Sequence, residues 1–214
     1  EENALMSRIL YLQASPRAAQ SLSIAVADAF LEAYRRHHPA DTVTVLNLFQ
    51  NELPPFDGAV LDAKYAVLSG KPHTPEQAEA WKAVTRVASE FAGHDKFVLA
   101  AAMWNFSIPY RLKHYLDLLI QPGLTFRFSP ENGYSGLVTG KSAFLALARG
   151  GEYPPGSPAA PFDFQRPYLE TILGFIGFTE IHTVTVEPTL GDPERTARSL
   201  GEARAKAAEI ARTF

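Results

Sequence analysis

The stretch Met103-Trp104-Asn105-Phe106 has the side chains expected of a surface that holds a flat, partly polar ligand. Methionine and two aromatic rings surround an amide, directly after the apolar run Lys96–Ala102. Such a run predicts a strand buried on both faces, and an amphipathic helix follows it. Ligands of open α/β sheets bind at the carboxyl ends of strands. The junction is therefore either a ligand-binding shelf or a packed turn between strand and helix.

A second group of hydroxyl and cationic side chains follows the first expected strand. Ser15 and Arg17 lie in the loop, and Ser21, Leu22 and Ser23 open the next helix. Hydroxyls and free N–H groups at a helix N-terminus bind anions, and Arg17 adds a charge-assisted bond to a phosphate. Neither GxGxxG nor GxxxxGK[ST] occurs, so the dinucleotide fingerprint and the P-loop do not apply. Capping of the helix by Ser21 is the simpler alternative.

Paired glycines form the third group, after the fourth expected strand. Gly150 and Gly151 follow Ala148 and Arg149, and Tyr153 comes two residues later. Glycine lets a ring or phosphate approach the backbone closely and leaves N–H groups accessible. A tight surface turn would use the same residues.

Strands alternating with helices position these three groups. Apolar and β-branched runs predict strands at 9–12, 42–48, 96–102, 142–148 and 180–186. Helices are expected at about 21–36, 60–68, 75–91 and 164–176, after Pro109, and from Asp192 to near the end of the sequence, with a capping box at Thr74 and Gln77. This alternation predicts one α/β domain over 6–214: a flavodoxin-like, doubly wound, five-stranded parallel sheet of order 2-1-3-4-5 with helices on both faces.

Residues 125–138 interrupt the alternation. Thr125 to Phe128 alternates in polarity, Asn132-Gly133 is a turn signal, and a second extended run reaches Val138. The pattern predicts a hairpin flap with Phe126 and Phe128 on one face. These rings either cap a flat ligand or pack on the core beneath.

In the predicted sheet order, the three groups follow adjacent strands. One ligand with a phosphate at residues 15–23 and a planar head between residues 103–106 and 150–151 would contact all of them. Flavin mononucleotide (FMN) has that shape.

Composition narrows the classes of function that remain open. The net charge of −3 disfavours a nucleic-acid partner, and no apolar run reaches membrane-spanning length. Without a signal-peptide pattern, a cytoplasmic location is expected, and residues 1–5 have the character of a tag remnant. The absence of cysteine excludes disulfides, thiolate-bound clusters and cysteine nucleophiles, and the six histidines lack the spacing of a metal site. Redox chemistry would therefore use an organic cofactor.

Over residues 6–214 the chain resembles the FMN-dependent NADH-azoreductases, relatives of the NAD(P)H:quinone oxidoreductases. The most specific matches are Ser15-Pro16-Arg17 with Ser21-Leu22-Ser23, residues 103–109 with Leu112-Lys113, residues 123–126, and Arg149-Gly150-Gly151 with Tyr153. Two positions depart from the family pattern: Trp104 stands where many relatives have tyrosine, and Ala148 where several have serine.

The resemblance implies that Ser15, Ser21 and Ser23 bind the FMN phosphate. It implies ring contacts from Met103, Trp104, Asn105 and Phe106, and from Ala148, Arg149, Gly150 and Gly151. It also implies a homodimer with its sites at the interface, whose substrate wall includes Phe126, Phe128 and Phe175, part of it from the partner subunit.

The expected activity is two-step reduction of quinones and azo compounds by NADH or NADPH through the flavin, which carries the chemistry. Asn105 would fix the ring, and Tyr153 is a candidate proton donor. A flavodoxin-like electron carrier and a cofactor-free protein of the same fold are the alternatives. The preference for NADH or NADPH, and for quinones or azo compounds, stays open.

Overall fold

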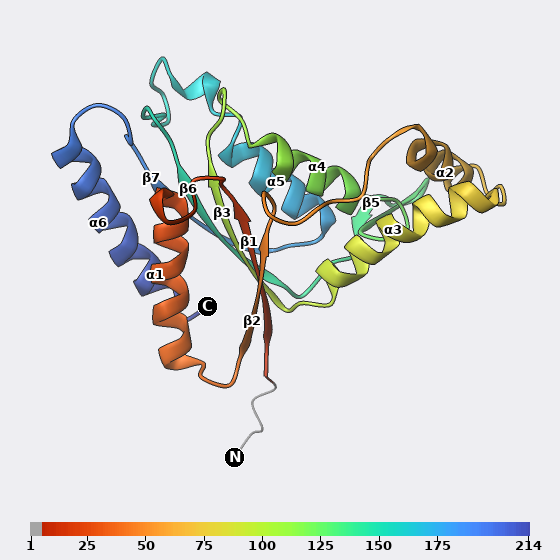
Figure 1. The fold of residues 1–214 in the computed structure, drawn as a ribbon, viewed down its shortest axis with the longest axis horizontal. Coiled ribbons are helices and arrows are strands. Elements are labelled where there is room, and N and C mark those ends of the chain that lie inside the picture. Colours follow the sequence, from red (N-terminus) through yellow and green to blue (C-terminus); the bar gives the residue numbers. More distant parts are fainter. Residues whose placement is uncertain (1–5) are drawn as a thin grey trace.

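Five parallel strands form the centre of the computed structural model, which describes residues 6–214 (Figure 1). They are β1 (Arg8–Ala14), β2 (Thr42–Asn47), β3 (Lys96–Ala102), β6 (Ser142–Ala148) and β7 (Glu180–Val186). Their order is β2-β1-β3-β6-β7, and every neighbouring pair is parallel. The predicted order is confirmed. The expected tag remnant at residues 1–5 lies outside the described residues.

Side chains alternate across the sheet and build a separate core on each face. In β3, Phe97 and Leu99 belong to one buried cluster, whereas Val98 and Ala100 belong to the other. Successive strand residues point to opposite faces, so a run without polar residues requires cover on both. Burial of each large side chain contributes about 1.5–3 kcal/mol.

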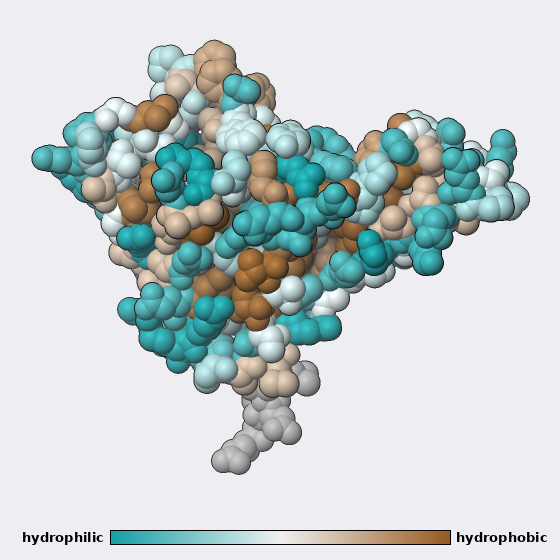
Figure 2. All heavy atoms as spheres, in the orientation of Figure 1, coloured by the Kyte–Doolittle hydropathy of each residue, from teal (hydrophilic) through white to brown (hydrophobic). Residues whose placement is uncertain are grey.

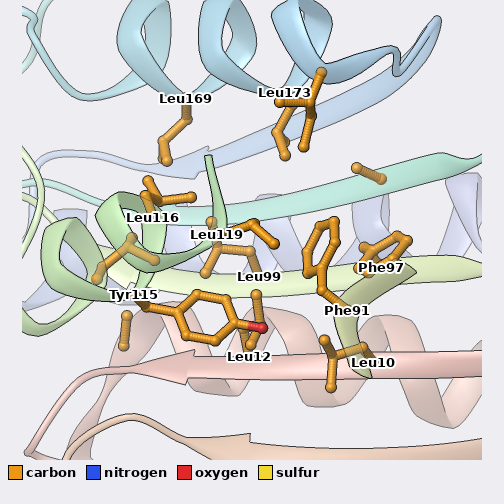
Figure 3. Packing of buried hydrophobic residues seen from close by; sticks show 14 of the residues in the cluster. Leu10, Leu12, Phe91, Phe97, Leu99, Tyr115, Leu116, Leu119, Leu169 and Leu173 are labelled. Carbon is orange, nitrogen blue, oxygen red and sulfur yellow. The ribbon is translucent and has the colours of Figure 1, made fainter. Parts of the chain in front are cut away.

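Helices supply that cover. α1 (Leu22–His37) and α6 (Pro193–Ile210) pack against each other on one face. α3 (Pro75–Ala92), α4 (Tyr110–Leu119) and α5 (Arg166–Ile176) carry the residues of the other core, part of which Figure 3 shows. α2 (Gly58–Leu68) packs on α3, and Figure 1 shows this pair extending past the sheet. Two short 3₁₀ helices, η1 (Ala18–Gln20) and η2 (Ala160–Phe162), lie in loops.

Side-chain to backbone hydrogen bonds lie at the starts of two of these helices. The Thr74 side chain accepts from the Gln77 N–H at 3.2 Å, and the Gln77 side chain accepts from the Thr74 N–H at 3.0 Å, which confirms the predicted capping box. α5 begins at Arg166 rather than at the predicted Phe164. Just before it, Asp163 Oδ1 accepts from the N–H groups of Gln165 at 3.0 Å and Arg166 at 3.1 Å.

The predicted flap is an antiparallel hairpin of β4 (Phe126–Ser129) and β5 (Gly133–Gly136). A methyl group added at Gly136 would lie 2.3 Å from the Ile176 backbone carbon. The Val138 N–H also donates to the Ile176 carbonyl at 2.8 Å. The flap is therefore fastened to the carboxyl-terminal end of α5.

The surface is mixed in character. Figure 2 shows hydrophilic groups over much of the visible face and an apolar patch over the edge strand β2, where the Val45 side chain is exposed. Among residues 6–214, no helix has both the length and the apolar character that crossing a bilayer requires.

Candidate functional site

A cavity of about 490 Å³ opens at the carboxyl ends of β1, β3 and β6. Its walls bring together residues from all three predicted groups. The lining consists of Ser15, Arg17, Ser21, Leu22, Ala102, Met103, Trp104, Asn105, Phe106, Ala148, Gly150, Gly151, Tyr153, Thr189 and Leu190. Residues from distant parts of the sequence thus meet at the edge where ligands of open α/β sheets bind.

One end of the cavity carries buried hydroxyls at the start of α1. Ser21 Oγ accepts from the Ile24 N–H at 3.4 Å and lies 3.1 Å from Ser23 Oγ. Among residues 6–214, the N–H groups of Leu22 and Ser23 have no protein acceptor. Because the first N–H groups of a helix lack intrahelical acceptors, this end suits an anion. Capping by Ser21 and anion binding therefore coexist at this helix start.

Residues 104–107 form a tight turn on the opposite wall. Trp104 and Ser107 exchange backbone hydrogen bonds, and the two residues between them have positive φ angles: 47° at Asn105 and 68° at Phe106. Asparagine tolerates this left-handed backbone, whereas phenylalanine adopts it rarely and at a cost of about 1–3 kcal/mol. The turn holds the backbone and side chains of both residues at the cavity.

Aromatic rings extend this wall on both sides. The Trp104 ring lies 5.8 Å from that of Phe49 and 6.2 Å from that of Tyr110, measured between ring centres. The Phe106 ring lies 5.2 Å from that of Phe162 and 6.5 Å from that of Tyr153. Aromatic side chains on both flanks favour flat ligands.

The glycine wall is shaped by a segment that the sequence reasoning missed. Thr189 and Leu190 follow β7 and line the cavity beside Gly150. A methyl group at Gly150 would lie 2.8 Å from Leu190 Cδ1, so glycine allows this approach. β7 is the neighbour of β6 in the predicted sheet. The strand order could therefore have indicated that the residues after β7 line the same cavity.

Two predicted cofactor ligands do not line the cavity. Ser23 is fully buried in α1 behind Ser21. The Arg149 side chain is 3% exposed and contacts Asp163, Gln165 and Glu187. The Arg149 side chain turns away from the cavity, and only its backbone continues the wall that its neighbours form.

Phe126, Phe128 and Phe175 are also absent from the cavity lining. Phe126 and Phe175 pack together with ring centres 4.9 Å apart, at the carboxyl-terminal end of α5. The opposite end of α5 is the one near the cavity, since the Phe164 N–H donates to the Phe106 carbonyl at 2.9 Å. At 1.5 Å per residue, the helix separates its two ends by about 15 Å. Within one subunit the flap therefore does not reach this cavity, and Phe126 packs on the end of α5 instead.

A second hollow runs along α4 from the first. Trp104 and Asn105 line both, and the second is completed by Phe56, Ile108, Tyr110, Lys113, His114 and Asp117. The Lys113 ammonium and the Asp117 carboxylate form an ion pair of 2.5 Å on its floor. Trp104 and Asn105 thus lie between the two hollows.

Comparison with known proteins places the chain among flavodoxin-like, FMN-dependent enzymes. A family model described as a flavodoxin-like fold matches residues 7–211. An FMN-dependent NADH:quinone oxidoreductase of Nitratidesulfovibrio vulgaris is 51% identical over 207 residues, which cover 97% of each chain. A Bacillus anthracis azoreductase structure has a TM-score of 0.88 at 33% identity, covering 98% of this chain and all of the other. An FMN-dependent NADH-azoreductase from the same species, in complex with FMN, has a TM-score of 0.83 at 26% identity, covering 96% and 100%.

Proposed function

We propose that this chain binds FMN and reduces quinones and azo compounds with NADH, because it belongs to the FMN-dependent NADH:quinone oxidoreductases of flavodoxin-like fold. The observation that carries the proposal is one cavity in which a hydroxyl-rich helix start faces an aromatic turn and a glycine wall. The predicted family, cofactor and reaction class are those of the relatives. Their names give NADH as the reductant.

The residues present fit a phosphate at one end. Ser15 and Ser21 offer buried hydroxyls, and the N–H groups that open α1 offer donors. Arg17 is exposed at the rim and carries no ion pair among the described residues, so it is available to the anion. Ser23 supports the site through its contact with Ser21.

The residues present also fit a planar ring at the other end. Asn105 places an amide at the ring edge, while Met103 and Trp104 supply polarizable and aromatic surface. Gly150 and Gly151 permit close approach on the other wall, with Ala148 beneath them. Bound FMN would supply the redox chemistry by taking a hydride from NADH and passing it to the acceptor.

The chain's own residues orient the bound flavin and select the acceptor. The aromatic walls of Trp104, Phe106 and Tyr153 favour flat acceptors. The Tyr153 hydroxyl stands beside this slot as the candidate proton donor to the reduced acceptor. Replacement of Tyr153 by Phe tests that role, with lower turnover and unchanged FMN affinity expected.

A second copy of the chain completes the substrate wall in this proposal. The flap is too far along α5 to reach its own cavity, and yet the Phe128 ring is 61% exposed. A homodimer that brings the partner's flap over the slot accounts for both features. Sedimentation should give the mass of two chains, and a monomeric active enzyme would contradict this arrangement. Cytoplasmic residence and the absence of nucleic-acid and membrane partners stay predictions from composition.

Rapid mixing of the FMN-loaded protein with NADH tests the central proposal. We expect the flavin absorbance to bleach at a rate no slower than turnover, and parallel double-reciprocal plots with a quinone as acceptor. A protein that binds FMN and yet does not react with NADH would instead be an electron carrier. A protein that takes up no FMN would favour the cofactor-free alternative.

A further inference from the structure

Arg149 places a buried positive charge directly behind the cavity wall. Its side chain is 3% exposed, although the residues on both sides of it, Ala148 and Gly150, line the cavity. A guanidinium is always charged, so its burial requires compensating groups. The groups around the guanidinium therefore show how its charge is compensated.

Three side chains from two other segments surround the guanidinium. Its Nη2 lies 2.9 Å from Asp163 Oδ2, an ion pair whose angle departs from that of a hydrogen bond. Its Nε donates to Gln165 Oε1 at 3.2 Å, and its Nη1 donates to Glu187 Oε2 at 3.4 Å. We call Arg149, Asp163, Gln165 and Glu187 the buried cluster.

The members that precede α5 fasten the aromatic turn. Gln165 is fully buried, and its Nε2 donates to the carbonyl of Ala101, at the end of β3, at 3.3 Å. The neighbouring Phe164 N–H donates to the Phe106 carbonyl. The buried cluster thus holds the wall that contains Trp104 and Phe106.

Glu187 fastens the other walls. Its Oε2 also accepts from the Tyr153 N–H at 3.4 Å, and Thr189 two residues later donates to the Arg149 carbonyl at 2.8 Å. One guanidinium therefore connects the aromatic turn, the glycine wall and the segment after β7.

The charges of the buried cluster do not cancel. One cation faces two carboxylates, and the Asp163 and Glu187 side chains are 11% and 25% exposed. Interactions between charges are stronger at partly buried sites than in water and are screened less by salt. A net negative charge therefore acts on whatever occupies the cavity.

We propose that the buried cluster positions three walls of the FMN cavity and that its net negative charge lowers the reduction potential of bound FMN. The proposal rests on the proposed function, because it requires FMN in this cavity. Uptake of two electrons and one proton adds one negative charge to the flavin, which a negative neighbour disfavours. The cluster thus makes reduced FMN a stronger donor to quinones.

Glu187→Gln tests the charge. We expect the ratio of the affinity for reduced FMN to the affinity for oxidised FMN to be about tenfold higher in this variant than in the wild type. For a two-electron couple, that change raises the reduction potential of bound FMN by ~30 mV. Glu187→Asp disturbs the packing but keeps the charge, so its potential should stay at the wild-type value. Glu152→Gln is the matched control: it is one residue from Gly151 but half-exposed, in a surface pair with Arg195.

Arg149→Lys tests the positioning. It keeps the charge but cannot reach three partners, so we expect a Kd for FMN at least tenfold higher and little change in potential. Arg195→Lys should change neither. Thermal unfolding identifies variants that fail to fold, and Asp163→Asn then replaces Glu187→Gln as the charge test.

An unchanged potential in Glu187→Gln, or an equal shift in Glu187→Asp, would overturn the charge role. Unaltered FMN affinity in Arg149→Lys would overturn the positioning role. Either result leaves the proposed function standing. A wild-type protein that binds no FMN overturns the proposed function, and this inference with it.

Discussion

Trp104 and Ser107 donate their backbone N–H groups to each other's carbonyls, each at 2.9 Å. This pairing forces Asn105 and Phe106 into the left-handed turn that faces the cavity. The backbone of this turn is therefore as much a part of the site as its side chains.

Replacing Asn105 separates these two contributions. Asn105→Gly removes the amide but suits the positive φ angle, so we expect unchanged or higher thermal stability. The Kd for FMN should be about tenfold higher, because one hydrogen bond to the flavin is lost. Asn105→Ala also strains the turn and should bind FMN more weakly still. Flavin fluorescence titration measures both values. Equal affinities in the two variants would show that the turn geometry is unimportant.

Trp104→Tyr tests the residue that departs from the family pattern. Tyrosine keeps an aromatic ring beside Phe49 and Tyr110, so FMN should stay bound with a Kd within about threefold of wild type. The smaller ring reshapes the slot and should shift the ratio of kcat/KM for quinones over azo compounds. Loss of all FMN would show that the tryptophan itself holds the flavin ring.

Arg17→Ala should weaken binding of the phosphate alone. Loss of a charge-assisted hydrogen bond costs about 1.5–3 kcal/mol, which raises the Kd for FMN at least tenfold. Riboflavin lacks the phosphate, so its Kd should not change. Arg35→Ala, at the other end of α1, is the control. An equal loss for both flavins would contradict a phosphate contact.

Phe128→Ala should impair the acceptor step without destabilising the fold. The ring is exposed, so the free energy of unfolding should change by less than about 0.5 kcal/mol. We expect a several-fold lower kcat/KM for quinones and an unchanged Kd for FMN. Tyr65→Ala, which removes an equally exposed ring from α2, should leave kinetics unaltered.

Mixing Phe128→Ala chains with Arg17→Ala chains tests the subunit of origin. In a mixed dimer, an intact cavity on one chain meets an intact flap on the other, so activity should recover. No recovery after subunit exchange would place the flap over its own cavity, against the proposed dimer.

His38 should make stability depend on pH. Its ring stacks on Tyr34 with centres 4.3 Å apart, and its buried Nε2 has no hydrogen-bond partner among the described residues. Burial, then the nearby Lys96 and His37 charges, lower the pKa of His38, whereas Asp41 opposes them. Below about pH 6.5 the unfolded chain thus binds more protons than the folded chain, and stability falls.

Melting temperatures at pH 7.5 and 5.5 measure this effect. His38→Phe keeps the stack but cannot titrate, so it should lose less stability on acidification than the wild type. His37→Gln removes only the smallest of the charges that lower the pKa of His38, so it should lose nearly as much stability as the wild type. An identical loss in His38→Phe and the wild type would exclude His38 as the cause.

Periodicity along the chain is enough to predict the sheet and the place of the cavity. Continuous apolar runs such as Lys96–Ala102 require cover on both faces, and alternation with helices then sets a parallel order. Parallel strands end at one edge, so the residues after β1, β3 and β6 had to meet there. These are consequences of local periodicity, which a single chain displays.

The directions of individual side chains depend instead on long-range packing. Arg149 turns away from the cavity because Asp163 and Glu187, from distant segments, compensate its charge behind the wall. Phe126 and Phe128 lie far from the cavity because Gly136 docks the flap on the end of α5. Both outcomes depend on contacts between segments far apart in sequence, which periodicity does not encode.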